Sequence, residues 1–401
     1  MLSCKWRYLW TFTPGRFNFD TWKSLHESGD GFKIDPRTYV SRVNEVLKLH
    51  KGPFIDEFRI RFALDARDSH EIDSWISFAF EKGVQRFELD LEASMYLPVH
   101  WPYVFPTPYD FPTVEKFLIG SNSLQRRPSH GHLTRTVGST GFCSLVALRL
   151  SYVNVTSEVI EHFLASCPFL EQLHVLFAIH LRTLKVAGSS LKLKFLEISG
   201  CPSLSVLEIS AINLKSFTYK GRFVRVLLNN VPVLSELCTG EGYCTSVIYK
   251  SCRRLSYLPQ LERLKLHLPH EVSMYNPFMF QCLMSLLAFL IRFQYVLSDP
   301  DRSQKLFLMK RARVAAKHRH DRLKVVELVG FMGHETELEL ASHLLEIAVS
   351  LDKMIINPRH LISRQNRELE VFRNMEALQR ARERARQLEA KLTPKADLVV
   401  L

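Results

Sequence analysis

The most regular feature of this sequence is a triplet of apolar residues at positions i, i+3 and i+5. The triplets recur as Ile55-Phe58-Ile60, Val84-Phe87-Leu89, Val114-Phe117-Ile119, Leu145-Leu148-Leu150, Leu170-Leu173-Val175, Leu181-Leu184-Val186, Leu193-Leu196-Ile198, Leu204-Leu207-Ile209, Leu214-Phe217-Tyr219 and Leu261-Leu264-Leu266. Side chains of a β-strand alternate between its two faces, so the last two residues of each triplet point the same way. Each triplet therefore predicts a short strand with two apolar side chains in a core.

The spacing of the triplets separates two kinds of repeat. The first four start 29 to 31 residues apart, which leaves room for a helix in each repeat. His70–Lys82 predicts such a helix from its apolar spacing, and Ser157–Ser166 predicts another, with Thr156 or Ser157 as N-cap. From Leu170 to Leu214 the triplets start 10 to 12 residues apart, too close for a strand, a helix and two turns.

These closely spaced triplets are interpreted as half-repeats. Those starting at 170, 193 and 214 would face one side and those starting at 181 and 204 the other, so each series has a period of 21 to 23 residues. This period is typical of a leucine-rich repeat with a second short strand on its convex side. An antiparallel sandwich with a strand every 11 residues or so is the alternative. The preceding helical repeats favour the solenoid.

Beyond residue 268 the pattern predicts a different end to the repeats. Glu271–Leu290 predicts a helix, and a strand is expected near Arg292–Leu297. A strand is then followed by a turn at Gly330–Gly333, a helix at Glu335–Ser350 and a strand at Leu351–Pro358. An uncapped end of a repeat array would expose apolar surface and a strand edge, so this unit is predicted to cap the sheet.

The residues from Leu361 onward form a charged segment with helical propensity. Its apolar residues lie roughly along one stripe, and Glu376 and Arg380 make a favourable i,i+4 pair. Three alternatives are open: a solvent-exposed tail, a helix that binds a partner, or a second cap. Because Glu335–Ser350 is predicted to cover the end of the sheet, removal of residues 361–401 is expected to leave the repeats folded.

Phrases near both ends of the chain resemble a known family. The segment Leu-Ser-x-x-Trp-Arg-x-Leu-Trp at positions 2–10, followed by Phe-Asn-Phe-Asp at 17–20, resembles the last helix and exit of an F-box. The phrases Leu-Lys-x-Val-Glu at 323–327 and Leu-Leu-Glu-x-Ala-x-x-Leu at 344–351 resemble the FBD module. With the repeats between them, the chain resembles plant F-box proteins with leucine-rich repeats and a terminal FBD module.

The repeats and this resemblance together predict an α/β fold. It is a leucine-rich-repeat solenoid with a curved parallel sheet, helices and short strands on the convex side, and an FBD-like βαβ unit as C-terminal cap. The predicted parts are a remnant of the C-terminal part of an F-box at residues 1–25, the solenoid at 26–300, the cap at 301–360 and a charged helical tail at 361–401.

The resemblance also implies a function, the substrate-recognition subunit of a cullin-type (Skp-cullin-F-box) ubiquitin ligase whose repeats bind a target protein. A residual contact with the Skp-type adaptor would come from Leu2, Trp6, Arg7, Leu9 and Trp10. A complete F-box needs further residues before that segment, so the adaptor is expected as a partner only if the F-box is completed. The alternative is a stand-alone leucine-rich-repeat scaffold or decoy without a ubiquitin-ligase role.

The charge of the chain is uneven. The formal net charge is +12, and two segments account for all of it. Residues 302–324 hold nine Lys or Arg and one acid, and residues 364–395 hold nine Lys or Arg and five Glu. A polyanion-binding protein usually carries its charge on the folded binding face. A solvated face and tail are therefore preferred over a nucleic-acid-associated protein, and nucleic acid is not expected as a partner.

No arrangement of residues predicts catalysis, so no catalytic, cofactor or metal residue is assigned and the chain is not expected to be an enzyme. Gly330–Gly333 lacks the Lys-Ser/Thr of a phosphate-binding loop, and the histidines between 318 and 334 lack partners at metal-ligand spacing. The eight cysteines form no C-x-x-C pair. Without a secretory signal at Met1–Phe12, and with polar residues interrupting the apolar run Phe278–Leu297, a cytoplasmic or nuclear protein is expected and no membrane partner.

Overall fold

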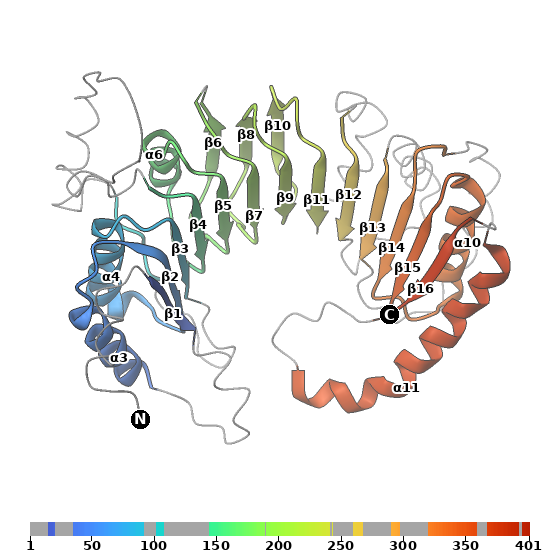
Figure 1. The fold of residues 1–401 in the computed structure, drawn as a ribbon, viewed down its shortest axis with the longest axis horizontal. Helices are drawn as coiled ribbons and strands as arrows, with labels where there is room; N and C mark the ends of the chain where they lie inside the picture. Colours follow the sequence, from blue (N-terminus) through green and yellow to red (C-terminus); the bar gives the residue numbers. More distant parts are fainter. Residues whose placement is uncertain are drawn as a thin grey trace. The chain divides into compact units, whose positions relative to one another are not determined.

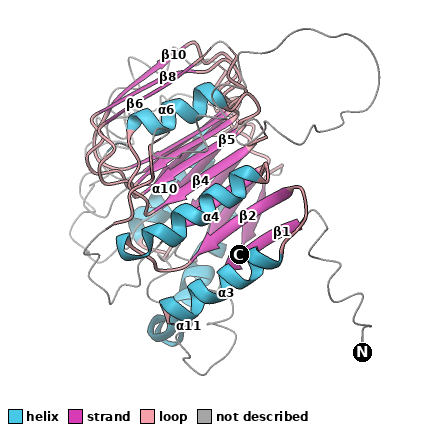
Figure 2. Ribbon diagram, turned by 90° about the vertical axis from the view of Figure 1, so that its left-hand side faces the viewer, coloured by secondary structure: helices cyan, strands magenta, loops and turns pink. Residues whose placement is uncertain are grey.

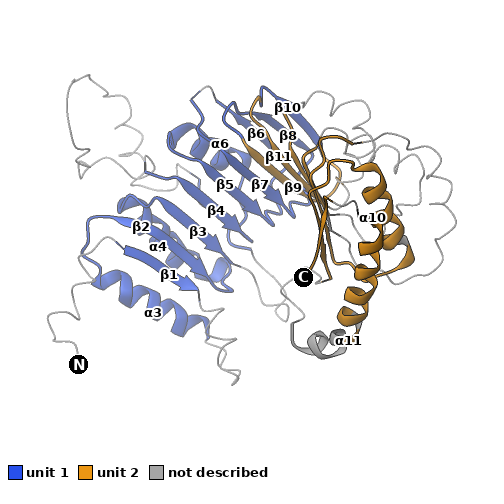
Figure 3. Cartoon of the chain, turned by 45° about the vertical axis from the view of Figure 1, so that its right-hand side comes forward, with its two compact units in different colours: residues 1–214, 225–231 blue, residues 215–224, 232–401 orange. Residues whose placement is uncertain are grey.

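The computed structural model describes residues 15–20, 35–91, 102–107, 144–188, 190–240, 243, 260–267, 290–296, 320–358, 367–392 and 395–401 (Figure 1). They belong to two compact units, coloured separately in Figure 3. Unit 1 comprises residues 1–214 and 225–231, and unit 2 comprises residues 215–224 and 232–401. The predicted domain boundaries divide the chain differently and stay a prediction.

Thirteen strands among the described residues belong to one long sheet. In unit 1 they are, in sheet order, β1 (Gly15–Asp20), β2 (Ile55–Arg61), β3 (Arg86–Asp90), β4 (Ala147–Ser151), β5 (Gln172–Leu176) and β7 (Phe195–Ser199). In unit 2 they are β9 (Ser216–Lys220), β11 (Glu236–Gly240), β12 (Arg263–His267), β13 (Arg292–Val296), β14 (Val325–Val329), β15 (Lys353–Asn357) and β16 (Asp397–Val400). Neighbouring strands within each unit run parallel, which confirms the predicted leucine-rich-repeat solenoid with a parallel sheet.

The triplet residues form the core, as predicted. Phe58 lies in register with Phe87, and Phe87 with Leu148, and all three side chains are buried. The rings of Phe58 and Phe87 stack with centroids 6.0 Å apart and planes 1° apart. Because burial of each such side chain contributes about 1.5–3 kcal/mol, this repetition is the main source of stability. The predicted strand at residues 114–119 lies outside the described residues, and β3 pairs directly with β4.

The half-repeats are confirmed as well. β6 (Thr183–Ala187) and β8 (Val206–Ser210) do not belong to the long sheet. With β10 (Arg225–Asn229) they form a three-stranded parallel sheet of unit 1, in which β8 lies between the other two (Figure 2). β5 and β7, which alternate with them in sequence, stay in the long sheet. β10 was not predicted, although the triplet spacing is present from Phe223 onward.

Helices complete the longer repeats of unit 1. The described ones are α3 (Pro36–Leu49), the 3-10 helix η2 (Ala66–Asp68), α4 (Ser69–Glu81) and α6 (Ser157–Ser166). α4 and α6 occupy the predicted positions, although Thr156 makes no side-chain capping bond to α6. α3 was not predicted. It starts at a proline, and Asp35 caps it by accepting a hydrogen bond of 3.0 Å from the backbone N–H of Thr38.

Unit 2 ends in two strand-and-helix layers rather than one. β14, α10 (Glu335–Ile347) and β15 form the predicted cap, and β13 lies where a strand was expected. The helix expected at Glu271–Leu290 lies, except for Leu290 itself, outside the described residues. Beyond β15 follow α11 (Arg367–Arg386), the 3-10 helix η5 (Gln387–Lys391) and β16, which pairs with β15. Ala381, Ala385 and Leu388 are buried. Of the three alternatives for the tail, the second cap is what the structure shows.

One sequence expectation needs correction at the C-terminal end of the sheet, and the place of a second segment was not expected. Residues 361–401 were expected to cover little of the sheet, yet β16 extends the sheet beyond β15. In addition, Arg384 Nη1 donates a 2.8 Å hydrogen bond to Gly333 O and Lys391 Nζ donates one of 2.9 Å to Ser342 Oγ. Residues 15–20, assigned to the F-box remnant, form β1 of the repeat sheet. Both segments were assigned by composition or resemblance, whereas strand pairing decides their place.

Candidate functional site

The outward face of the long sheet carries regular rows of side chains. Because strands pair in parallel register, the residue between the two inward residues of one triplet lies beside its counterpart in the next strand. In unit 1 these residues form a central row: Asn18, Arg59, Glu88, Arg149, His174 and Glu197. Opposite charges therefore meet across neighbouring strands.

The charged members of the central row are joined into one ladder of ion pairs. Glu88 accepts a hydrogen bond of 3.0 Å from Arg59 Nη2, and its carboxylate lies 2.8 Å from Arg59 Nε and 3.6 Å from Arg149 Nε. Arg149 Nη1 lies 3.7 Å from Glu197, whose carboxylate also contacts His174 Nδ1 at 2.8 Å. Each of the two carboxylates thus has two cationic or basic partners. Such networks hold side chains in place better than isolated surface pairs do.

A second, more deeply buried row lies at the carboxyl ends of the first strands. Arg61 lies between Asp20 and Asp90, with N–O distances of 3.7 Å and 3.4 Å, and the three side chains are only 7–10% exposed. Removal of one partner of such a pair would leave a poorly solvated charge. This row fixes the strand ends rather than offering free charges.

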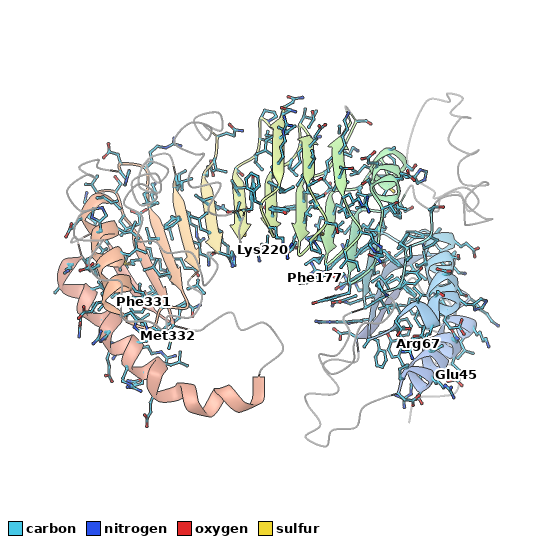
Figure 4. The ribbon with its side chains drawn as sticks, turned by 180° about the vertical axis from the view of Figure 1, so that it is seen from behind. Glu45, Arg67, Phe177, Lys220, Phe331 and Met332 are labelled. Carbon is cyan, nitrogen blue, oxygen red and sulfur yellow. The ribbon has the colours of Figure 1, made fainter. Side chains whose placement is uncertain are left out.

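An aromatic pair stands at the rim beyond these strand ends. Tyr152 follows β4 with φ 58° and Phe177 follows β5 with φ 56°, and their rings stack 4.4 Å apart. Gly200 occupies the same place after β7 with φ 64°, and a Cβ atom there would lie 2.5 Å from the Phe177 ring. Bulky residues rarely adopt positive φ, which costs about 1–3 kcal/mol each. Phe177 is 41% exposed and lies at the end of its strand (Figure 4).

The outward face of unit 2 has isolated ion pairs instead of a ladder. It also has basic residues that lack a carboxylate partner among the described residues. Arg263 pairs with Glu236, and Arg292 lies 3.3 Å from Glu327. Among the described residues, no ion pair involves Lys220, Lys265 or His267. Burial, together with the charges of the two lysines, holds the pKa of His267 at about 3, so its imidazole is neutral.

One carboxylate of the cap is buried. Glu337 Oε2 accepts hydrogen bonds from the backbone N–H groups of Met332, Gly333 and His334, at 2.9, 2.8 and 3.1 Å. Burial outweighs these three bonds and raises the pKa of Glu337 to about 7. The turn that holds it contains the buried Phe331, labelled with Met332 in Figure 4. The Glu337 carboxylate holds the backbone of the turn between β14 and α10 in place through these three hydrogen bonds.

The site residues assigned from the sequence are Leu2, Trp6, Arg7, Leu9 and Trp10, and all five lie outside the described residues. The ion-pair ladder was not predicted. A signal for it exists, since Arg59, Glu88, Arg149 and Glu197 occupy the same place in four described triplets and alternate in sign. Alignment of the triplets by their inward residues would have found it.

Three further observations concern the described residues outside the outward rows. No group of three or more His, Cys, Asp or Glu that could hold a metal ion occurs in the described part of the chain. Burial raises the pKa of the Cys201 thiol to about 11, so this thiol is unreactive. Within the described ranges, no helix has both the length and the apolar character to cross a membrane.

Two family models match the chain. The model of the At1g61320/AtMIF1 LRR domain matches residues 46–307, well over half of the chain, and the FBD model matches residues 317–356. The second match contains β14 and α10, together with most of β15, which is the unit predicted to be FBD-like. The repeats and the cap are therefore each matched by a family model of their own.

Relatives from Arabidopsis thaliana agree with these matches. The F-box/LRR-repeat protein At3g03360 is 29% identical over 222 residues, which are 52% of this chain and 37% of that protein. The F-box/FBD/LRR-repeat protein At1g13570 is 27% identical over 272 residues, 66% of this chain and 55% of that protein. The chain thus spans from about a third to about half of these relatives. It belongs to the leucine-rich-repeat family of the At1g61320/AtMIF1 model, and its FBD segment groups it with the plant F-box/LRR proteins.

Proposed function

We propose that this chain is the target-recognition part of a Skp-cullin-F-box ubiquitin ligase that works in the cytoplasm or nucleus. The observation that carries the proposal is the outward sheet face, where side chains from six neighbouring strands of unit 1 form one row and ion pairs join five of them. The names of its relatives, which combine F-box and leucine-rich repeat, support the ligase context.

In this role the chain makes and breaks no bond. A target bound to the sheet face would be held near the ubiquitin-transfer machinery, which raises the effective concentration of its lysines there. A pre-organised face suits this task, because side chains already fixed by ion pairs lose little conformational entropy on binding. The proposal assigns specificity to the outward residues and stability to the triplets.

The adaptor contact is the second half of the proposal. A complete F-box would bind the Skp-type adaptor, and Leu2, Trp6, Arg7, Leu9 and Trp10 would form the last part of that contact. A stable, specific complex buries roughly 1,200 Å² or more in total, which a short segment alone does not supply. We therefore expect the 401-residue chain by itself to bind the adaptor weakly.

A pull-down with purified Skp-type adaptor tests this half. The 401-residue chain is compared with a fusion that adds the upstream helices of a complete F-box. We expect strong capture by the fusion, weak capture by the chain alone, and reduced capture by the fusion carrying Trp6→Ala and Leu9→Ala. If the fusion fails to bind while an unrelated intact F-box protein binds in the same assay, the ligase role is wrong and the scaffold alternative replaces it.

Proximity labelling in plant cells tests the recognition half. Glu88→Arg would reverse the central charge of the ladder, and Lys185→Glu, an exposed lysine of β6 in the three-stranded sheet, is the matched control. We expect the proteins labelled by the unchanged chain to be labelled by the control and lost with Glu88→Arg. Equal labelling by both variants would show that targets do not bind the outward face.

A further inference from the structure

Three basic side chains of unit 2 gather at one end of its outward face. Lys220, Gly240 and His267 are the last residues of β9, β11 and β12, and the strand register places them side by side in this order. Lys265 precedes His267 by two residues on the same strand, so it faces the same side of the sheet. Figure 4 shows Lys220 at the end of its strand.

Gly240 allows the two outer residues of this row to approach each other. A Cβ atom on Gly240 would lie 3.0 Å from Lys220 Cγ and 3.1 Å from His267 Cβ, closer than side-chain atoms normally pack. The aliphatic stem of the lysine and the imidazole therefore converge above a bare stretch of backbone. Glycine at this position lets the two basic side chains come close to each other on the outward face.

Among the described residues, the basic groups of this cluster lack the carboxylate partners that two outward arginines of the same unit have. Arg263 and Arg292 of the same unit are paired with glutamates. Lys220 and Lys265 make no ion pair among the described residues, and His267 Nε2 is buried there without a hydrogen-bond partner. A buried polar atom without a partner costs about 1–3 kcal/mol, so an acceptor bound at this place would relieve a cost of the free protein.

We propose that Lys220, Lys265 and His267 form a binding site for a carboxylate on an acidic segment of a protein partner. This inference rests on the proposed recognition function and names the chemistry of the target. Two ammonium groups would supply the charge, and the imidazole would donate from Nε2 once that atom carries a proton. A cation would be repelled by both lysines.

The surroundings favour a peptide over a nucleic acid. Glu236 and Glu327 stand on the same face of unit 2, each paired with one arginine. A continuous phosphate backbone would meet these carboxylates along with the basic cluster, and nucleic-acid affinity depends on many phosphate contacts. A peptide can instead place a single acidic side chain against the cluster of Lys220, Lys265 and His267 and neutral residues elsewhere.

Binding of an acidic peptide to the full 401-residue chain tests the proposal. The probes are a labelled peptide of alternating Glu and Gly and its counterpart with Gln in place of Glu, followed by fluorescence anisotropy. We expect the Lys220→Ala/Lys265→Ala double variant to lose about tenfold or more in affinity for the Glu peptide. Lys185→Ala, which removes a lysine charge from β6 in unit 1, should bind as the unchanged chain does.

Gly240→Ala separates the geometry of the site from its charge. This variant keeps every basic group but places a methyl group between Lys220 and His267, so we expect a loss of affinity that net charge cannot explain. Circular dichroism checks that the variant is folded. As a second readout, the peptide should raise the pKa of His267, followed by its ring-proton NMR signal and assigned through His267→Gln.

Several outcomes would overturn the proposal. These are equal affinity for the Gln peptide, unchanged affinity in the double variant, and an unmoved His267 signal in the presence of bound peptide. Binding of inorganic phosphate or duplex RNA without binding of the Glu peptide would also contradict it. Because these assays need no adaptor, failure of the adaptor pull-down leaves this site standing, and failure of this site leaves the adaptor result standing.

Discussion

Neighbouring strands pair in parallel register within each of the two units, but the outward faces of the units distribute charge in different ways. In unit 1 the central row alternates in sign, and every Arg and Glu in it has an ionic partner. In unit 2 the pairs are isolated, and Lys220, Lys265 and His267 have no carboxylate partner among the described residues. The same backbone thus presents a neutralised row in one unit and open basic groups in the other. The net charge of the chain does not reveal this difference between the two outward faces.

The largest expected effect concerns the register on which this comparison depends. Leu196 of unit 1 and Leu264 of unit 2 point inward and are buried. The residues next to them in each strand point outward. Leu196→Asp or Leu264→Asp would bury an unpaired carboxylate, at a cost of several kcal/mol, and should abolish the cooperative melting transition in circular dichroism. A melting temperature within a degree or two of the unchanged chain would mean that the outward faces are assigned wrongly.

The rim of each unit offers the next test. Gly200→Ala would place a methyl group 2.5 Å from the Phe177 ring in a residue with φ 64°, so we expect a loss of about 3–4 kcal/mol in urea unfolding. Gly221 holds the corresponding place after β9 in unit 2, where the nearest atom would be the Tyr219 hydroxyl at 3.0 Å. Gly221→Ala should cost less, because a side-chain end can move.

A double variant identifies the cause of the loss at Gly200. Adding Phe177→Ala removes the ring that collides with the new methyl group, so part of the stability should return while the cost of positive φ stays. If Phe177→Ala adds its own loss to that of Gly200→Ala, the aromatic rim does not explain the requirement for glycine.

A pH dependence should distinguish unit 2. The pKa of Glu337 is about 7 in the folded chain against an ordinary 4.5, so between these values the folded chain holds a proton that the unfolded chain has released. Raising the pH from about 4.5 to 7 should therefore lower the free energy of unfolding, by up to about 3 kcal/mol. Glu337→Gln should remove this part of the pH profile. An identical profile in the variant would contradict the assignment.

The smallest effects compare single charges of the two faces. Glu88→Gln leaves Arg59 and Arg149 without their shared carboxylate and should cost about 1–2 kcal/mol in unfolding experiments. Lys265→Ala removes a cation that has no carboxylate partner in the described part of the chain, so its effect should lie near zero or be slightly stabilising. Equal losses in both variants would remove the distinction between a paired and an open face.

Most of the fold could be read from the sequence because its signal is local. An inward pair such as Leu207 and Ile209 reveals a strand within six residues of chain, and α4 and α6 show their buried side by spacing alone. β11 escaped prediction because Thr239 occupies its second inward position, where the other triplets carry an apolar residue. β16 escaped because its apolar residues end a segment dominated by charge.

The outward site was harder to predict because its partners lie far apart in the chain. Arg59 and Glu88 are 29 residues apart, and His174 and Glu197 are 23 apart, so only the strand register brings them together. The cluster of Lys220 with His267 also depends on Gly240 in the strand between them. Composition places the excess charge in residues 302–324 and 364–395, which contain no member of the ladder or of the basic cluster.

The direct pairing of β3 with β4 has a consequence for how this chain can change over time. Between these strands lie 56 residues, against 20 between β4 and β5, yet both pairs keep the same parallel register. Because the entropy of closing a loop grows only with the logarithm of its length, the longer connection adds about 1 kcal/mol. New sequence can therefore enter this interval at small thermodynamic expense, and the repeat array can diversify there while its strands keep their places.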